Sequence, residues 1–180
     1  MVRRVEVVDY DVRWDERFDV ESQRIRTATT RPQNLVSVNH IGSTSVVGLA
    51  AKPIIDILLV VKNLEELDSE REVFERLGYE YLGEFGIPGR RYMRKGLVQG
   101  RESHHIHAFQ YDNISEIQRH LSVRNYLRRH PGVAERYGEL KKRLAAQFPT
   151  GIEGYSQGKD AFVQAMERDA LMEHWRREEI

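Results

Sequence analysis

The chain has 180 residues with 28 basic and 28 acidic side chains, and this balance gives no indication of nucleic-acid binding, which usually requires a basic surplus. It contains no cysteine, which excludes disulfides, thiol nucleophiles and cysteine-ligated metal clusters. No segment approaches the roughly 18 consecutive apolar residues of a membrane span, and the polar start predicts no secretory signal, so we expect a cytoplasmic protein with no membrane contact.

The first half of the chain predicts strands with helices between them. Residues 36–41 alternate between apolar and polar side chains, as one half-buried strand does. Residues 54–61 are almost entirely apolar, which is typical of a strand buried on both faces, so we expect this strand at the centre of the sheet. The other elements predicted here are strands over 5–10, 79–83, 90–95 and 104–111, and helices over 15–28 and 64–77.

The second half of the chain predicts helices only. They are expected over residues 114–129, 131–148 and 155–175, and the proline at position 131 separates the first two. The fold class is therefore α+β. We expect an α/β core over residues 1–112 and a C-terminal helical annex over 113–180, packed on the core as one compact unit.

A loop of small residues, Gly42-Ser43-Thr44-Ser45, precedes the apolar strand that carries Asp56. A tight Gly-Ser turn lets backbone N–H groups and a hydroxyl approach a phosphate closely. A carboxylate inside an apolar strand is costly without a partner, and a divalent cation or a lysine would supply one. The pattern is therefore typical of phosphate and metal binding, or of an ordinary turn followed by a strand-end carboxylate.

Two histidines form the second candidate group. His105 and His107 are two residues apart on a predicted strand, so their side chains point to the same face, and His104 points to the other. Two imidazoles on one face suit metal binding, phosphate binding or acid–base chemistry. The alternative is a structural role, which is usual for a histidine on a strand.

Basic residues and one tyrosine supply the remaining candidate phosphate ligands. Arg124 and Arg128 share a face of the first late helix because they are four residues apart. Guanidinium groups bind phosphates through two parallel hydrogen bonds. The alternative for each is a solvated surface position beside an acidic partner. The full set is Lys52, Arg91, Arg124, Arg128, Tyr155 and Lys159.

The long segment His40-Ile-Gly-Ser-Thr-Ser-Val-Val-Gly-Leu-Ala-Ala-Lys-Pro-Ile-Ile-Asp-Ile57 resembles the signature of the GrpB family, also called the UPF0157 family. The histidine pair at 105–107 and Tyr155 with Lys159 agree with the same family, and the resemblance covers about residues 5–165. It implies a nucleotidyltransferase-like fold of the polymerase-β superfamily. Such a fold is a mixed sheet flanked by helices, in which a Gly-Ser turn precedes a strand with metal-binding acids.

One hypothesis for the function follows from these residues together with the implied fold. It is metal-dependent transfer of a nucleotidyl group from a nucleoside triphosphate to an unknown acceptor, with Mg²⁺ or Mn²⁺ at the catalytic residues Asp56, His105 and His107. Leu58 stands where the superfamily carries a second acid, so the histidines or Glu84 would complete the metal site. The alternatives are a nucleotide- or phospholigand-binding module without catalysis, and a metal-dependent phosphoesterase that uses the histidine pair.

The candidate residues are expected to meet in one place. We expect Ser43, Asp56 and the two histidines to line one cleft, because Asp56 requires a partner and both Asp56 and the histidine pair lie on strands of one presumed sheet. The late helices are expected to close over it and to deliver the charges of Arg124, Arg128 and Lys159. The expected partner is a nucleotide or another phosphorylated small molecule, and no oligomeric state is predicted.

Overall fold

The computed structural model describes residues 4–96 and 102–178, and the chain divides into two compact units. The sheet unit consists of residues 13–41 and 54–117. The helical unit consists of the segment up to Val12, residues 42–53 and the chain from Gln118 onward. The helical unit thus contains two segments from the first half of the chain, and the division expected after residue 112 stays a prediction.

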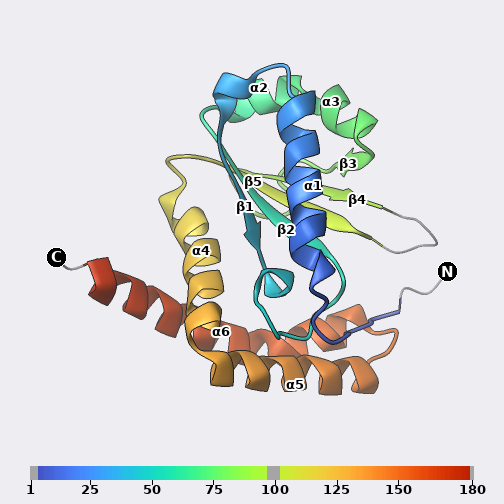
Figure 1. The fold of residues 1–180 in the computed structure, drawn as a ribbon, viewed down its shortest axis with the longest axis vertical. Helices are drawn as coiled ribbons and strands as arrows, with labels where there is room; N and C mark the ends of the chain where they lie inside the picture. Colours follow the sequence, from blue (N-terminus) through green and yellow to red (C-terminus); the bar gives the residue numbers. More distant parts are fainter. Residues whose placement is uncertain (1–3, 97–101, 179–180) are drawn as a thin grey trace. The chain divides into compact units, whose positions relative to one another are not determined.

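The sheet unit holds a five-stranded mixed sheet in the order β1-β2-β5-β4-β3 (Figure 1), which confirms the α+β class. Its strands are β1 (Leu35–Ile41), β2 (Ile55–Val61), β3 (Tyr79–Tyr81), β4 (Arg90–Lys95) and β5 (His104–Gln110). β2 pairs with β5 in parallel and with β1 antiparallel, so the apolar strand is an interior one. The middle position belongs to β5, and the prediction that the segment 54–61 is central was wrong by one strand.

Three helices of the same unit cover one face of the sheet: α1 (Arg13–Ala28), α2 (Leu64–Ser69) and α3 (Arg71–Arg76). Lys95 of β4 reaches α1, where its ammonium lies 2.6 Å from a Glu21 carboxylate oxygen. Arg91, four residues earlier on the same strand, reaches Asp68 of α2 at 2.7 Å. Side chains alternate along a strand, so odd-numbered residues of β4 face these helices and even-numbered ones face away.

The predicted helix over 64–77 is in fact two helices that meet at Glu70, where the backbone leaves helical geometry. The Glu70 carboxylate accepts hydrogen bonds from the hydroxyl of Thr29 at 2.6 Å, from the hydroxyl of Thr30 at 2.8 Å and from the backbone N–H of Arg31 at 3.1 Å. These donors follow the end of α1. A contact forty residues away in sequence thus decides where the helix breaks, and helical periodicity carries no sign of it.

We expect Glu70→Gln to lower the free energy of unfolding by about 1–3 kcal/mol. The substitution replaces one carboxylate oxygen, which accepts hydrogen bonds, with an NH₂ group, which can only donate them. Urea denaturation of the variant would measure the loss. Glu72→Gln, an exposed residue of α3, is the matched control and should stay within about 0.5 kcal/mol of the wild type. Equal stabilities of the two variants would contradict a role for Glu70 in joining the helices.

The helical unit is built from α4 (Ile114–Arg129), whose first turn belongs to the sheet unit, α5 (Pro131–Gln147) and α6 (Ile152–Glu178). Its core packs loop residues Val46 and Leu49 against residues of all three helices, among them Leu127, Tyr137 and Met166. The strand expected over 5–10 is only a single bridge between Val8 and Ala51, so that prediction was wrong. Within residues 4–96 and 102–178, no helix combines the length and the apolar character needed to cross a membrane.

Candidate functional site

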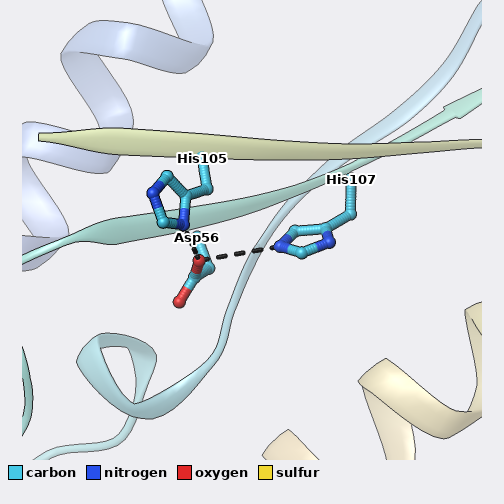
Figure 2. Close-up of side chains that lie close together, drawn as sticks. All are labelled: Asp56, His105 and His107. Carbon is cyan, nitrogen blue, oxygen red and sulfur yellow. Dashed lines mark ion pairs between the residues drawn. The ribbon is translucent and has the colours of Figure 1, made fainter. Parts of the chain in front are cut away.

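β2 and β5 bring the predicted catalytic residues together. The strands run in parallel register, with Asp56 opposite His105 and Leu58 opposite His107. Because side chains alternate along a strand, Asp56, His105 and His107 emerge on one face of the sheet (Figure 2), the face turned away from α1 to α3. His104 points to the helix-covered face, as predicted.

The carboxylate of Asp56 lies at the spacing of shared-ion ligands from each of the two histidines. One oxygen of Asp56 lies 3.4 Å from Nδ1 of His105 and 3.7 Å from Nε2 of His107, and all three ligand atoms lie within 4.8 Å of one another. Two ligands of one ion, each bound at about 2.1 Å, lie roughly 3.0–3.7 Å apart, so the carboxylate–imidazole spacings fit. Glu84 is not in this group, since its carboxylate accepts from the backbone N–H of Gly89 at 2.7 Å.

Glu102 makes the second contact of His105. Its carboxylate is 3% exposed and lies 2.6 Å from Nε2 of the ring, while Nδ1 faces Asp56. Metal-binding histidines usually donate their second ring N–H to a carboxylate in this way, which fixes the tautomer and leaves the other nitrogen available. Glu102 therefore orients His105 for ligation.

Arg90 makes a different contact with His107. Its Nη1 atom lies 3.5 Å from Nδ1 of the ring, and an arginine side chain only donates. In a neutral ring the proton is then on Nε2, where it points at Asp56. To bind an ion through Nε2, the neutral ring would have to carry its proton on Nδ1, facing Arg90. The Arg90 contact is too long to oppose this shift of the proton strongly.

Burial and mutual charge set the protonation of the triad. Burial acts to raise the pKa of Asp56, but hydrogen bonds from His105 and His107 outweigh it and hold that pKa well below its usual range. Burial acts to lower the pKa of His105, but the carboxylates of Asp56 and Glu102 outweigh it and raise that pKa to about 9. At neutral pH, without an ion, Asp56 is therefore charged and His105 is protonated.

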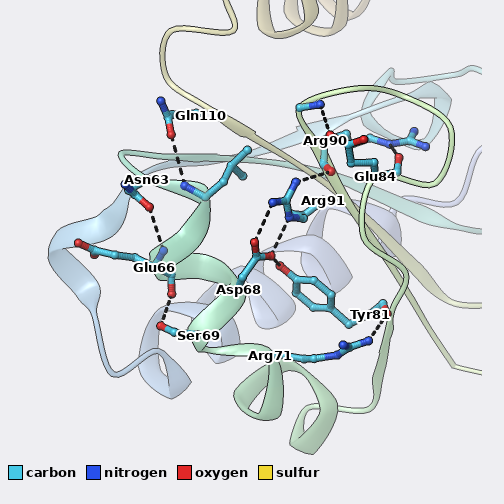
Figure 3. A network of polar contacts seen from close by, with 12 residues as sticks. Asn63, Glu66, Asp68, Ser69, Arg71, Tyr81, Glu84, Arg90, Arg91 and Gln110 are labelled. Atoms are coloured by element: carbon cyan, nitrogen blue, oxygen red, sulfur yellow. Dashed lines mark hydrogen bonds and ion pairs between the residues drawn. The ribbon is translucent and has the colours of Figure 1, made fainter.

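Arg91, a predicted phosphate ligand, lies on the opposite face of the sheet from the triad. Its guanidinium donates two hydrogen bonds of 2.7 Å to Asp68, which also accepts from the Tyr81 hydroxyl (Figure 3). The structure therefore does not bring Arg91 and Asp56 together. Arg90 is the arginine of β4 that contacts the triad.

The predicted phosphate loop lies in the helical unit. Gly42 has a φ of 70°, which favours glycine, and the Ser45 hydroxyl closes the turn by donating to the Gly42 carbonyl at 2.6 Å. Thr44 is buried within this turn. The ammonium of Lys141, on α5, donates to the Ser43 hydroxyl at 2.7 Å and is almost completely buried. Ser43 and the triad belong to different units, and a common cleft stays a prediction.

Two arginines of α4 lie at the same loop. Arg128 donates to the carbonyl of Ser45 from Nε at 3.0 Å and from Nη2 at 2.7 Å. Arg124 and Ser43 line a cavity of about 100 Å³, and burial together with the charge of Arg128 lowers the pKa of Arg124. The other lining residues, mostly apolar, are Gly42, Val123, Leu127, Tyr137, Val163 and Met166.

The remaining predicted residues meet at one aromatic ring. The ammonium groups of Lys52 and Lys159 each lie 5.5 Å from the centroid of the Tyr155 ring, which is buried. Burial raises the pKa of the Tyr155 hydroxyl to about 12, so it stays protonated at neutral pH. The structure therefore groups Lys52, Tyr155 and Lys159 within the helical unit.

Sequence reasoning missed three residues that contact the candidate sites: Arg90, Glu102 and Lys141. A signal existed for Lys141, because it follows Tyr137 by four residues and precedes Leu144 by three, on the buried stripe of α5. A lysine on an apolar stripe requires a polar partner. Glu102 lies before the strand that carries His105, so the periodicity of a strand does not relate the two residues.

Comparison with known proteins gives one family throughout. The family model described as GrpB protein matches residues 4–169. A crystal structure of the conserved protein GrpB from Enterococcus faecalis superposes with a TM-score of 0.89 at 48% identity, covering 94% of this chain and 99% of that one.

Curated relatives agree. The UPF0157 protein YqkA of Bacillus subtilis is 42% identical over 168 residues, which are 93% of this chain and 48% of that protein. The UPF0157 protein PA4798 of Pseudomonas aeruginosa is 38% identical over 89% of this chain and 65% of its own length. The glutamate-rich protein GrpB of Alkalihalophilus pseudofirmus is 31% identical over 87% and 90% of the two chains. The chain thus spans about half of YqkA and less than two thirds of PA4798.

Proposed function

Since this chain belongs to the GrpB family, we propose a function from the chemistry of the site within it: metal-dependent transfer of a nucleotidyl group from a nucleoside triphosphate to an acceptor hydroxyl. The proposal includes a nucleotidyltransferase-like fold for the mixed sheet and its helices. One observation carries it, namely the convergence of Asp56, His105 and His107 with Glu102 behind His105.

The donor set of the triad selects among metals. One carboxylate and two imidazoles form a mixed set of oxygen and nitrogen ligands, and imidazole suits transition metals better than Mg²⁺. We therefore favour Mn²⁺ or Zn²⁺ over Mg²⁺. When bound, such an ion neutralises charge on a phosphate and lowers the pKa of a coordinated water or hydroxyl.

The reaction replaces one bond to the α-phosphorus with another. The acceptor oxygen forms a bond to the α-phosphorus, the bond from that phosphorus to the α–β bridging oxygen breaks, and pyrophosphate leaves with the electron pair. The acceptor proton must go to a base. We assign this role to whichever of His105 and His107 does not ligate the ion.

Incubation with a triphosphate labelled at the α-phosphate tests this reaction. With Mn²⁺ and a panel of hydroxyl acceptors, the wild type should release pyrophosphate and transfer the label, and Asp56→Asn should do neither. Release of labelled monophosphate without an acceptor would assign hydrolysis instead, the reaction of a phosphoesterase. The absence of turnover with every metal of the panel would overturn the enzymatic proposal.

A second candidate function, binding of a phosphorylated ligand without turnover, is favoured by the helical unit alone. There Lys141 is 3% exposed and donates to Ser43, and Arg124 lines the adjacent cavity. Hydroxyl, ammonium and guanidinium groups at one loop are the donors that bind phosphate oxygens.

We expect Lys141→Met to weaken binding of ATP in the absence of metal by about tenfold, because one charge-assisted hydrogen bond is lost while the apolar stem is replaced. Titration calorimetry would measure the change. Lys142→Met, at the exposed neighbouring position, is the control and should bind as the wild type does. If both variants bind equally and only Lys141→Met melts at a different temperature, the lysine is structural.

A further inference from the structure

The turn between β3 and β4 holds an aromatic side chain in an unfavourable conformation. Phe85 has a φ of 45°, and among the residues described it is the one non-glycine residue with positive φ. Bulky residues rarely adopt this region, and such strain concentrates at functional sites. The side chain is also 59% exposed, so burial of the ring does not compensate for the backbone.

Arg90 holds this conformation. Its side chain donates to the backbone carbonyl of Glu84 at 3.2 Å (Figure 3) and to that of Phe85 at 2.7 Å. Arg90 itself is buried, and its Nη1 atom lies 3.5 Å from the ring of His107. One arginine therefore connects the strained turn with a candidate metal ligand, which places both in a single rigid arrangement.

The Phe85 ring is the outer member of a row of aromatic contacts that begins at the triad. It stacks on Tyr92, with centroids 5.2 Å apart and an angle of 17° between the planes. Tyr92 in turn contacts His105 and His107, with centroid distances of 5.4 and 5.3 Å. One face of Phe85 is thus covered by Tyr92, and the ring still has more than half of its surface in solvent.

We propose that Phe85 is the platform on which the nucleobase of the substrate stacks while its phosphates reach Asp56 and the two histidines. This inference rests on the proposed function, and it identifies the substrate as a ligand with a planar aromatic ring. A base on the exposed face would extend the stack of Tyr92 and Phe85 by one layer. Stacking of this kind accepts any base, since each has a π face.

Leucine and tyrosine at position 85 separate stacking from bulk. Phe85→Leu keeps an apolar side chain but removes the π face, so ATP with Mn²⁺ should bind roughly tenfold more weakly, whereas Phe85→Tyr should bind as the wild type does. Inorganic tripolyphosphate with Mn²⁺ has no base and should bind equally to all three proteins. Equal weakening of ATP and tripolyphosphate in Phe85→Leu would overturn the proposal, because the residue would then act on the metal site.

A fluorescent variant tests stacking even if no metal-bound phosphate is found. In Phe85→Trp, adenosine without metal should quench the added emission more strongly than it quenches free tryptophan amide. Ribose, which lacks the base, should not quench it. If tripolyphosphate fails to bind the wild type but adenosine quenches the tryptophan, the proposed reaction fails and the aromatic platform stands. Quenching no stronger than that of the free amide would overturn the platform.

Glycine at position 85 distinguishes a binding role from a structural one. Phe85→Gly accepts positive φ without strain, so the melting temperature should rise by about 2–4 °C while ATP binding falls as in Phe85→Leu. A gain in stability with a loss of binding is the outcome expected for a strained binding residue. A fall in melting temperature would show that the ring stabilises the turn, against the proposal.

Discussion

Asp56→Asn should weaken the binding of Mn²⁺ at least about 100-fold at neutral pH. This loss of affinity is as large as, or larger than, the greatest loss usually seen when a residue that only hydrogen-bonds to a metal ligand is replaced. Asparagine keeps the shape of the side chain and one oxygen, but it removes the single negative charge among the three ligands. It also removes the carboxylate that lies 3.4 Å from His105 and 3.7 Å from His107. Titration calorimetry, or the loss of the free-ion signal of Mn²⁺ in electron paramagnetic resonance, would measure the affinity.

Two further variants make this prediction specific. Glu102→Gln should weaken Mn²⁺ binding by about 10–100-fold, because it loosens the hydrogen bond that orients His105 without removing a ligand. Asp112→Asn changes an exposed carboxylate of the same unit and should bind as the wild type does. If folded Asp56→Asn retained the affinity of the wild type, Asp56, His105 and His107 would be a polar cluster and not a metal centre.

Lys95→Met should lower the free energy of unfolding by about 3–5 kcal/mol at neutral pH, because it removes the closer countercharge of a buried carboxylate and leaves only the half-exposed Arg24, at 3.5 Å. Glu21 is 3% exposed, and its carboxylate accepts from Lys95 at 2.6 Å and from the Tyr79 hydroxyl at 3.0 Å. Burial acts to raise the pKa of Glu21, but Lys95, His104 and Tyr79 together outweigh burial and lower that pKa. Urea denaturation at several pH values would measure the loss.

The sign of the pH dependence follows from the lowered pKa of Glu21. In the wild type, the stabilisation by the charged carboxylate is present above the unfolded pKa and is lost as the pH falls through the folded one. In Lys95→Met, burial is no longer opposed by the lysine, and the carboxyl takes up a proton more readily. The difference from the wild type should therefore be largest near pH 7 and should shrink on acidification.

Two variants control this prediction. Arg76→Met removes an exposed partner of Glu72, at 3.7 Å, and should cost less than about 1 kcal/mol. Combining Lys95→Met with Glu21→Gln should recover much of the lost stability, because the buried charge is then absent. A double variant as unstable as Lys95→Met would mean that the lysine acts through packing of its stem.

Short-range patterns in the sequence determined most of the elements. Alternation and continuous apolar character located β1, β2, β4 and β5, because a strand places side chains with a period of two. The same period determined that His105 and His107 share a face and that His104 does not. The cost of burying a carboxylate likewise required a partner for Asp56, whichever group that partner was.

Only the tertiary structure decided which groups meet. The helix predicted over 64–77 ends at Glu70, whose carboxylate accepts from Thr29. Lys141 donates to Ser43, which is 98 residues away in sequence. On β4, Arg91 pairs with Asp68, whereas Arg90 contacts His107. None of these pairs shares an element. Periodicity fixes the direction of a side chain within its own strand or helix, whereas its partner depends on how elements far apart in the chain pack, which local patterns do not encode.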